Sequence, residues 1–176
     1  MRWPRDSDQG NPPPVKKPTP KCDVQFVEQD IPNVPMAYHT YIETTVNGLN
    51  QFYEATNSPK SNPTSVNWTP LCLVGGCWLN KQTGVTGSTY DFASVLTVDI
   101  VVPNECAVVT NISSAFGLYR NNTHTYGTFL GPNSNSFTHS LLLLGGVSDF
   151  LADSINSLAS GLGFPLVGWD ASVPWP

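Results

Sequence analysis

The stretch from Gly131 to Leu144 constrains the fold more than any other part of this chain of 176 residues. It reads Gly-Pro-Asn-Ser-Asn-Ser-Phe-Thr-His-Ser, followed by four leucines. Gly-Pro is typical of a turn, and the Asn and Ser residues offer N-cap side chains. The apolar run predicts a buried helix over 136–144, ended by two glycines. Ser134 therefore lies where a core helix begins, and there backbone N–H groups and the helix dipole favour a nucleophile.

The clearest local signal elsewhere is a β-hairpin. Residues 38–45 and 51–55 are rich in β-formers and flank Asn-Gly at 47–48, which is typical of hairpin turns. We expect a loop slightly longer than the minimal two residues. The period of two places His39 and Glu43 on one face of the first strand.

The remaining pattern predicts one α+β domain, a small, mainly antiparallel sheet packed against two or three helices. The expected strands are a short one at 24–27 and a buried one at 92–102, and the expected loops are an exposed one at 56–70, a turn pinned by cysteines between 71–74 and 77–79, and one at 83–89. One helix is expected from Asn104 to Tyr119 and another at 148–160, with an apolar stripe of Phe150, Leu151, Ile155 and Leu158. In the tail, Trp169 and Trp175 are expected to pack back on the body. Residues 1–21 are Pro-rich and predict an extended tail or linker, so the globular domain spans 22–176.

The charge balance limits the partners of the chain. The formal net charge is −5, and most of the basic residues lie within the first 21 positions. Binding to nucleic acid needs a basic surface, so we expect no nucleic-acid partner. No apolar run reaches the length of a membrane span, and the first residues lack the apolar core of a signal peptide.

Four cysteines occur, at Cys22, Cys72, Cys77 and Cys106. The even number and the abundance of Ser, Thr and Asn are typical of an exported protein with disulfides, although three pairings are open. Reduced core cysteines are the alternative. The spacing of Cys72 and Cys77 is wide for a zinc knuckle and no second pair lies near, so we expect no metal and no cofactor.

Three histidines could act as a base: His39 on the predicted hairpin, His124 in a polar loop and His139 within the predicted core helix. A nucleophile needs such a base within reach, and the base needs an orienting partner. Cys106 lies in the first turn of a predicted helix, where a thiolate is stabilised. For this cysteine we favour a disulfide or core role over a reactive one.

Four short segments together resemble a known group of domains. They are His-x-Tyr-Ile at 39–42, Tyr-Glu-Ala at 53–55, Asn-Glu-Cys at 104–106 and the motif at 131–137. In this order they resemble C-terminal domains of bacterial YD-repeat (polymorphic-toxin-like) proteins. Those are similar to circularly permuted papain-like domains of the lecithin-retinol acyltransferase and NlpC kind. The resemblance spans about residues 36–146.

The resemblance implies a papain-like hydrolase or acyl-transfer effector that acts on an amide or ester bond. His39 would match the strand histidine and serve as general base. Ser134 would match the nucleophile, where the family has cysteine. Asn133 and Asn135 would lie beside the nucleophile, and the backbone amides near Asn135 and Ser136 would bind the oxyanion. The carboxylate that orients His39 would come from Glu43, Glu54 or Asp99. Serine is the weaker nucleophile and depends more on a well-placed base.

A second hypothesis is a catalytically inactive, disulfide-stabilised binding or structural module of the same fold, favoured by the missing cysteine. A third, a toxin acting on nucleic acid through His124, is disfavoured by the acidic charge. The resemblance implies a bacterial chain secreted or exported as part of a larger protein. It also implies an immunity or carrier protein as a partner.

Overall fold

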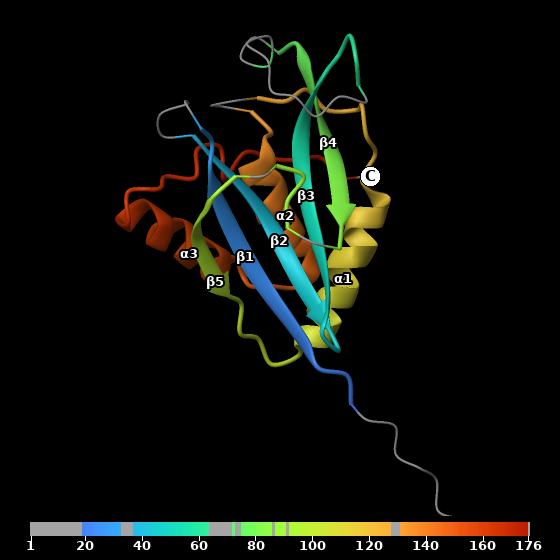
Figure 1. Ribbon diagram of the computed structural model, residues 1–176, viewed down its shortest axis with the longest axis vertical. Helices are drawn as coiled ribbons and strands as arrows, with labels where there is room; N and C mark the ends of the chain where they lie inside the picture. Colours follow the sequence, from blue (N-terminus) through green and yellow to red (C-terminus); the bar gives the residue numbers. More distant parts are fainter. Residues whose placement is uncertain are drawn as a thin grey trace, which may run out of the picture.

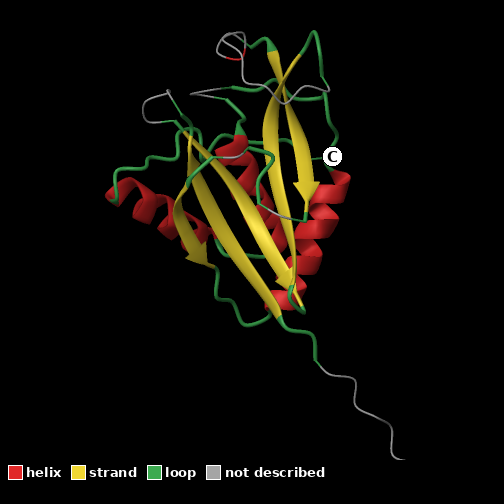
Figure 2. Ribbon diagram, viewed as in Figure 1, coloured by secondary structure: helices red, strands yellow, loops and turns green. Residues whose placement is uncertain are grey.

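The computed structural model describes residues 19–32, 37–63, 72, 75–85, 87–90, 92–127 and 131–175. These residues form an α+β fold in which three helices cover one face of a five-stranded antiparallel sheet (Figures 1 and 2). The strands are β1 (Cys22–Asp30), β2 (Tyr38–Val46), β3 (Leu49–Pro59), β4 (Cys77–Gly84) and β5 (Ser94–Asp99), in the sheet order β4-β3-β2-β1-β5. The expected fold class is confirmed at this level.

The β2–β3 hairpin has the minimal loop. Val46 pairs directly with Leu49, and Asn47 and Gly48 have φ angles of 52° and 82°. The expected longer loop is therefore wrong, because Asn and Gly together tolerate the positive φ values that a two-residue hairpin turn needs. The expected loop over 56–70 is also wrong in its first part, since 56–59 continue β3 and pair with β4. Residues 64–70 lie outside the described residues.

The sheet divides at one end into two pairs of strands. The β2–β3 ladder ends where Tyr41 pairs with Glu54. Beyond this point β2 continues beside β1 alone, and β3 continues beside β4 alone. The two pairs diverge toward the top of Figure 1, and α2 begins behind the gap. This parting of the sheet positions the candidate site described below.

The connection from β4 to β5 joins the two edges of the sheet and crosses the face opposite the helices (Figure 1). The described residues 87–90 and 92 of this connection lie over β2 and β3. The strand that follows is shorter and more exposed than the buried strand expected over 92–102. It covers Ser94–Asp99 only, and Val101 is 78% exposed. An edge position explains the difference, because β5 has a neighbour on one side only.

The three helices are α1 (Glu105–Leu118), α2 (Ser134–Gly145) and α3 (Asp149–Gly161), and each begins at an Asn or Ser cap. The expected helices are confirmed, with α2 starting two residues earlier than predicted. The predicted apolar stripe of α3 is wrong in part, because Phe150 is 84% exposed. The buried face of α3 consists of Ala152, Ile155 and Ala159, since small residues let α3 lie close to its neighbours.

A continuous core fills the space between the sheet and the helices. Phe26 and Phe137 are fully buried there, and Trp169 packs edge-on against Phe26 with 5.9 Å between ring centroids. Trp175 packs against the same core, so both tail tryptophans lie where the sequence predicts. A second, smaller cluster of Val27, Tyr41 and Phe52 lies on the opposite face of the sheet.

All four cysteines form disulfides, Cys22 with Cys106 and Cys72 with Cys77. The first links the start of β1 to the first turn of α1, and the second closes a short loop before β4. Disulfides of this kind are compatible with an extracellular or secreted protein.

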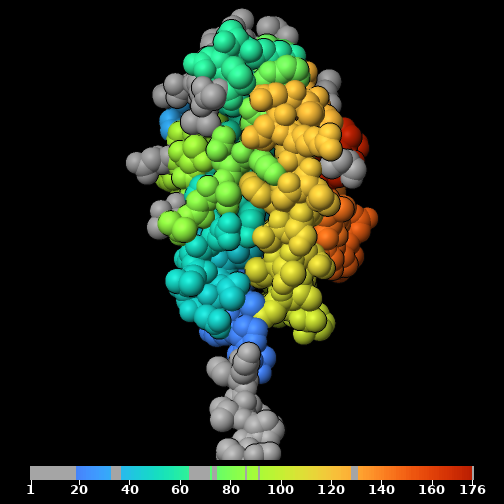
Figure 3. All heavy atoms as spheres, turned by 90° about the vertical axis from the view of Figure 1, so that its right-hand side faces the viewer, coloured from blue at the N-terminus to red at the C-terminus, as the bar shows by residue number. Residues whose placement is uncertain are grey.

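Figure 3 shows α1 beside the β2–β3 hairpin on one flank of the molecule. Among the described helices, none has both the length and the apolar character that crossing a bilayer requires.

Candidate functional site

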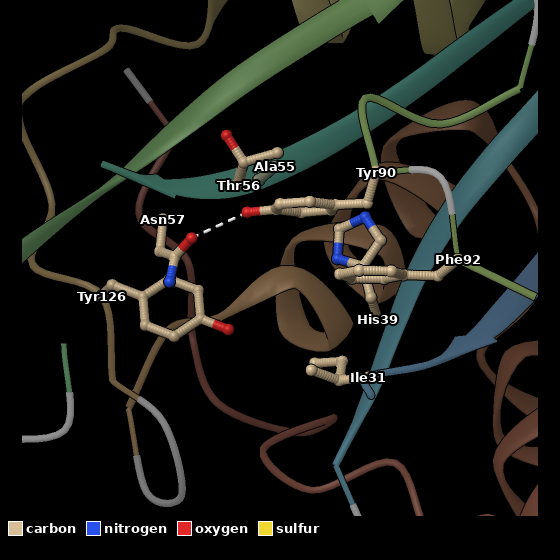
Figure 4. A pocket seen from close by; sticks show the side chains of 8 residues that line it. All are labelled: Ile31, His39, Ala55, Thr56, Asn57, Tyr90, Phe92 and Tyr126. Atoms are coloured by element: carbon tan, nitrogen blue, oxygen red, sulfur yellow. Dashed lines mark hydrogen bonds between the residues drawn. The ribbon is translucent and has the colours of Figure 1, made fainter. Parts of the chain in front are cut away.

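A small cavity lies in the gap where β2 and β3 part. It has a volume of about 30 Å³, which is room for about two water molecules. Figure 4 shows the residues that line it: Ile31, His39, Ala55, Thr56, Asn57, Tyr90, Phe92 and Tyr126. They come from the end of β1, from β2 and β3, from the crossing connection and from the segment before α2. The cavity is thus built by parts of the chain that are far apart in sequence.

His39 and Glu54 form a buried pair at one side of the cavity. The Nε2–H of His39 donates to Glu54 Oε2 at 2.6 Å. Successive side chains of a strand point to opposite faces of the sheet, and Thr40 points toward α2. The preceding residue, His39, therefore projects on the face away from the helices, and Glu54 projects on the same face. The structure therefore selects Glu54 as the partner of His39 among the three carboxylates considered.

The carboxylate of Glu54 is held in its charged form. Burial alone works to raise the pKa of Glu54, but hydrogen bonds from His39, Ser88 and Thr89 and the charge of His39 outweigh it, so the pKa lies below its usual value. Ser88 Oγ donates at 2.6 Å and the Thr89 amide at 2.7 Å. Both donors belong to the crossing connection, which explains why this segment lies over the pair.

The tautomer of His39 follows from this contact. Because Glu54 is ionised and can only accept, Nε2 carries a proton, and whenever the imidazole is neutral its lone pair therefore lies on Nδ1. Among the described residues Nδ1 has no hydrogen-bond partner, and it turns toward the cavity (Figure 4). Tyr90 packs edge-on against the ring with 4.9 Å between centroids and itself stacks on Phe92, so packed aromatic residues hold one side of the imidazole. This is the arrangement of an oriented base.

Tyr126 forms the far side of the cavity and contacts the start of α2. Burial raises the pKa of Tyr126, while hydrogen bonds with the side chain and backbone of Ser134 act in the opposite direction. Its ring points into the cavity opposite His39 (Figure 4). Tyr126 thus lines the cavity of His39 and lies close to Ser134.

Ser134 lies at the first position of α2 and is 2% exposed. Thr40 Oγ1 donates to the Ser134 carbonyl at 3.3 Å and to Asn135 Oδ1 at 3.2 Å. The residue next to His39 is therefore attached to the residues that begin α2. This contact brings the predicted base and the predicted nucleophile to the same region, although Ser134 does not itself line the cavity.

Asn133 and Asn135 hold the start of α2 in place. Asn133 Oδ1 accepts from the amides of Asn135 at 2.9 Å and Ser136 at 3.1 Å, and the Ser136 hydroxyl accepts from the Asn133 amide in a capping box. The two Asn side-chain amides both donate to the Val167 carbonyl. The amides of Asn135 and Ser136, predicted to bind an oxyanion, are thus already hydrogen-bonded to Asn133.

The other candidates lie away from the cavity. Glu43 accepts from Asn50 on β3, and Asp99 accepts from Gln25 on β1. Cys106 is in a disulfide, and the ring of His124 packs against Tyr119 at 5.8 Å. His139 lies further along α2, beside Trp169.

Sequence reasoning missed Tyr126, Ser88, Thr89 and Tyr90. Each of them lies in a connection, and no period or spacing relates a connection to the strand that it covers. A signal for Glu54 was present, because a two-residue loop at Asn47-Gly48 places Glu54 diagonally across from His39.

Comparison of the chain with models of protein families, with curated proteins and with solved structures found no match in any of the three.

Proposed function

We propose that this chain is a serine-dependent hydrolase or acyl-transfer domain that acts on an amide or ester bond. The observation that carries the proposal is the buried His39–Glu54 pair, whose second ring nitrogen faces a cavity and has no partner among the described residues. An ionised carboxylate that fixes the tautomer of a histidine is the orienting half of a catalytic triad. Ser134 supplies the nucleophile.

We propose the following chemistry for these groups once Ser134 Oγ comes within reach of His39 Nδ1. His39 Nδ1 takes the proton from Ser134 Oγ as the oxygen attacks the substrate carbonyl carbon, and it then returns the proton to the leaving amine or alcohol. Water or an acceptor nucleophile releases the acyl group in the second step. Because Asn133 occupies the next two amides, the Ser134 N–H is the donor at the start of α2 that remains for the oxyanion.

Tyr126 has to move for the substrate to enter. Its hydroxyl lies close to Ser134, which is where the substrate carbonyl would bind. The cavity of about 30 Å³ is too small for an acyl group in this arrangement. The described conformation is therefore a closed one, and displacement of Tyr126 joins the cavity to Ser134.

The resemblance to permuted papain-like domains supports the proposal, since it pairs a strand histidine with a residue at a helix start. On the same resemblance we propose that the chain is a toxin-like effector within a larger exported bacterial chain. Its proposed partner is an immunity or carrier protein. The serine in place of cysteine makes the oriented base more important, because a hydroxyl gives almost no free alkoxide near neutral pH.

A serine-directed fluorophosphonate probe tests the proposal. We expect wild type to be labelled at one site per chain and Ser134→Ala not at all. Ser157→Ala, at an exposed position of α3, is the matched control and keeps full labelling. His39→Gln slows labelling by about 10²-fold or more. Labelling that survives in Ser134→Ala rejects the assignment of the nucleophile.

A second candidate function is a non-catalytic binding module of the same fold. The burial of Ser134 at 2% exposure and the use of the neighbouring amides in the helix cap favour it. Under this alternative no folded variant is labelled, including one in which Tyr126 is replaced by alanine. The same set of proteins therefore decides between the two functions.

A further inference from the structure

The turn between α2 and α3 gathers three side chains that commonly bind metal ions. Gly146 ends α2 in the left-handed conformation, and Ser148 caps α3 two residues later. This tight connection places His139 of α2 against Asp149 and Asp153 of α3. One ligand atom from each of the three lies within 4.8 Å of the others. The two carboxylates are four residues apart and so share one face of α3.

His139 is oriented toward this cluster. Its Nδ1–H donates to the Trp169 carbonyl at 3.0 Å, and its ring stacks on the Trp169 indole with 4.7 Å between centroids. A carbonyl can only accept, so Nδ1 carries the proton and neutral His139 has its lone pair on Nε2. Hydrogen bonding of the far nitrogen to a backbone carbonyl is the usual second contact of a metal-binding histidine.

The free nitrogen of His139 faces the two carboxylates. The side chain is 12% exposed, and Nε2 itself is shielded from solvent and has no hydrogen-bond partner among the described residues. Nε2 lies 3.9 Å from Asp149 Oδ1, which is too far for a hydrogen bond. A shielded lone pair that no donor satisfies is unfavourable, and a cation held between Nε2 and the carboxylates would satisfy it.

The two carboxylates also lack a counter-charge. Among the described residues neither Asp149 nor Asp153 forms an ion pair with lysine or arginine. Asp149 is 79% exposed, so its side chain is free to turn toward a bound ion. The dipole of α3 favours an acidic residue in its first turn, which explains Asp149. It does not explain the orientation of His139.

We propose that His139, Asp149 and Asp153 form a binding site for a divalent metal ion of the zinc class. One imidazole nitrogen and two carboxylate oxygens suit Zn²⁺ better than Ca²⁺ or Mg²⁺, which prefer oxygen ligands alone. Three protein ligands leave one position for water. The ion would fasten α3 to α2, and the site shares no residue with the His39–Glu54 pair.

Calorimetric titration of the full, disulfide-intact chain with Zn²⁺, after removal of metals by a chelator, tests the site. We expect one Zn²⁺ per chain in wild type. We also expect the melting midpoint to rise by roughly 5–10 °C at a zinc concentration one hundred times Kd. Titration with Co²⁺ provides a second readout, its visible absorption spectrum. This absorption is stronger when nitrogen and oxygen ligands bind Co²⁺ with a coordination number below six.

The variants separate this site from adventitious binding. His139→Gln and Asp153→Asn should each weaken zinc binding at least tenfold, whereas His124→Gln and Asp23→Asn should leave it unchanged. Asp153 is exposed, so its replacement tests the site without disturbing the core. Ca²⁺ and Mg²⁺ should give no shift at the same concentrations. Absence of zinc binding in wild type, or equal binding by wild type, His139→Gln and Asp153→Asn, overturns the proposal.

Discussion

Glu28 lies directly opposite Thr40 in the β1–β2 ladder, and neither oxygen of its carboxyl group has a hydrogen-bond partner among the described residues. The side chain is completely buried, and burial raises the pKa of Glu28 to about 8. The alternation along β1 places it on the helix-facing side with Phe26. A carboxyl in such a place folds in its neutral form, since an unpaired buried charge is costly.

Glu28 therefore makes stability depend on pH. The pKa rises from 4.5 in the unfolded chain to about 8 in the fold, so the native state binds more protons between these values. We expect the free energy of unfolding to fall as pH rises from 4.5 to 8, by roughly 2 to 4 kcal/mol more in wild type than in Glu28→Gln. Urea unfolding at several pH values measures this difference. Asp23→Asn, an exposed acid on the same strand, should keep the wild-type slope, and an equal slope in Glu28→Gln would contradict the prediction.

Removal of the Tyr126 side chain should expose Ser134. We expect Tyr126→Ala to be labelled by the fluorophosphonate probe at least tenfold faster than wild type, because the ring and hydroxyl no longer cover the start of α2. The double variant Tyr126→Ala, Ser134→Ala should lose the labelling. Tyr38→Ala is a control that removes a tyrosine from β2 outside the cavity lining. An unchanged rate in Tyr126→Ala would show that Tyr126 does not control access to Ser134.

Gly168 allows the chain to approach Asn133, which caps α2. A Cβ at Gly168 would lie 2.4 Å from Asn133 Nδ2, and the φ of Gly168 is 77°. We expect Gly168→Ala to lower the free energy of unfolding by about 2–4 kcal/mol, through strain and loss of the cap. Gly163→Ala is the matched control, because its φ is also positive, at 92°, but a Cβ there would have open space. Its loss should be about 1 kcal/mol. Equal losses in the two variants would mean that the contact with Asn133 is unimportant.

The two disulfides should contribute unequally. Cys22 and Cys106 are 84 positions apart in sequence, whereas Cys72 and Cys77 are 5 apart. The chain-entropy model gives about 4–5 kcal/mol for the long loop and about 2 kcal/mol for the short one. Denaturant unfolding of the two paired Cys→Ala variants measures both values. A larger loss on removal of the short-loop disulfide would show that native contacts, and not chain entropy, dominate.

Local patterns determined the elements of this protein. The Asn-Gly turn and the flanking β-formers define the β2–β3 hairpin, and Asn and Ser caps mark the starts of the three helices, because these signals depend on residues only a few positions apart. The same reasoning placed His39 on a strand and Ser134 at a helix start. It also identified the cysteines as disulfide candidates, while leaving their pairing open.

Only the tertiary structure decided how these pieces meet. The divergence of β2 from β3, the crossing of the sheet by the β4–β5 connection and the contact of Tyr126 with Ser134 all depend on long-range packing. Packing also selected Glu54 over Glu43 and Asp99, and it turned β5 into a half-exposed edge strand. A linear pattern records which face of an element is apolar, but it carries no information about what covers that face. The motif from Gly131 to Phe137 therefore predicted the start of a helix, whereas the cavity beside it had to be seen in three dimensions.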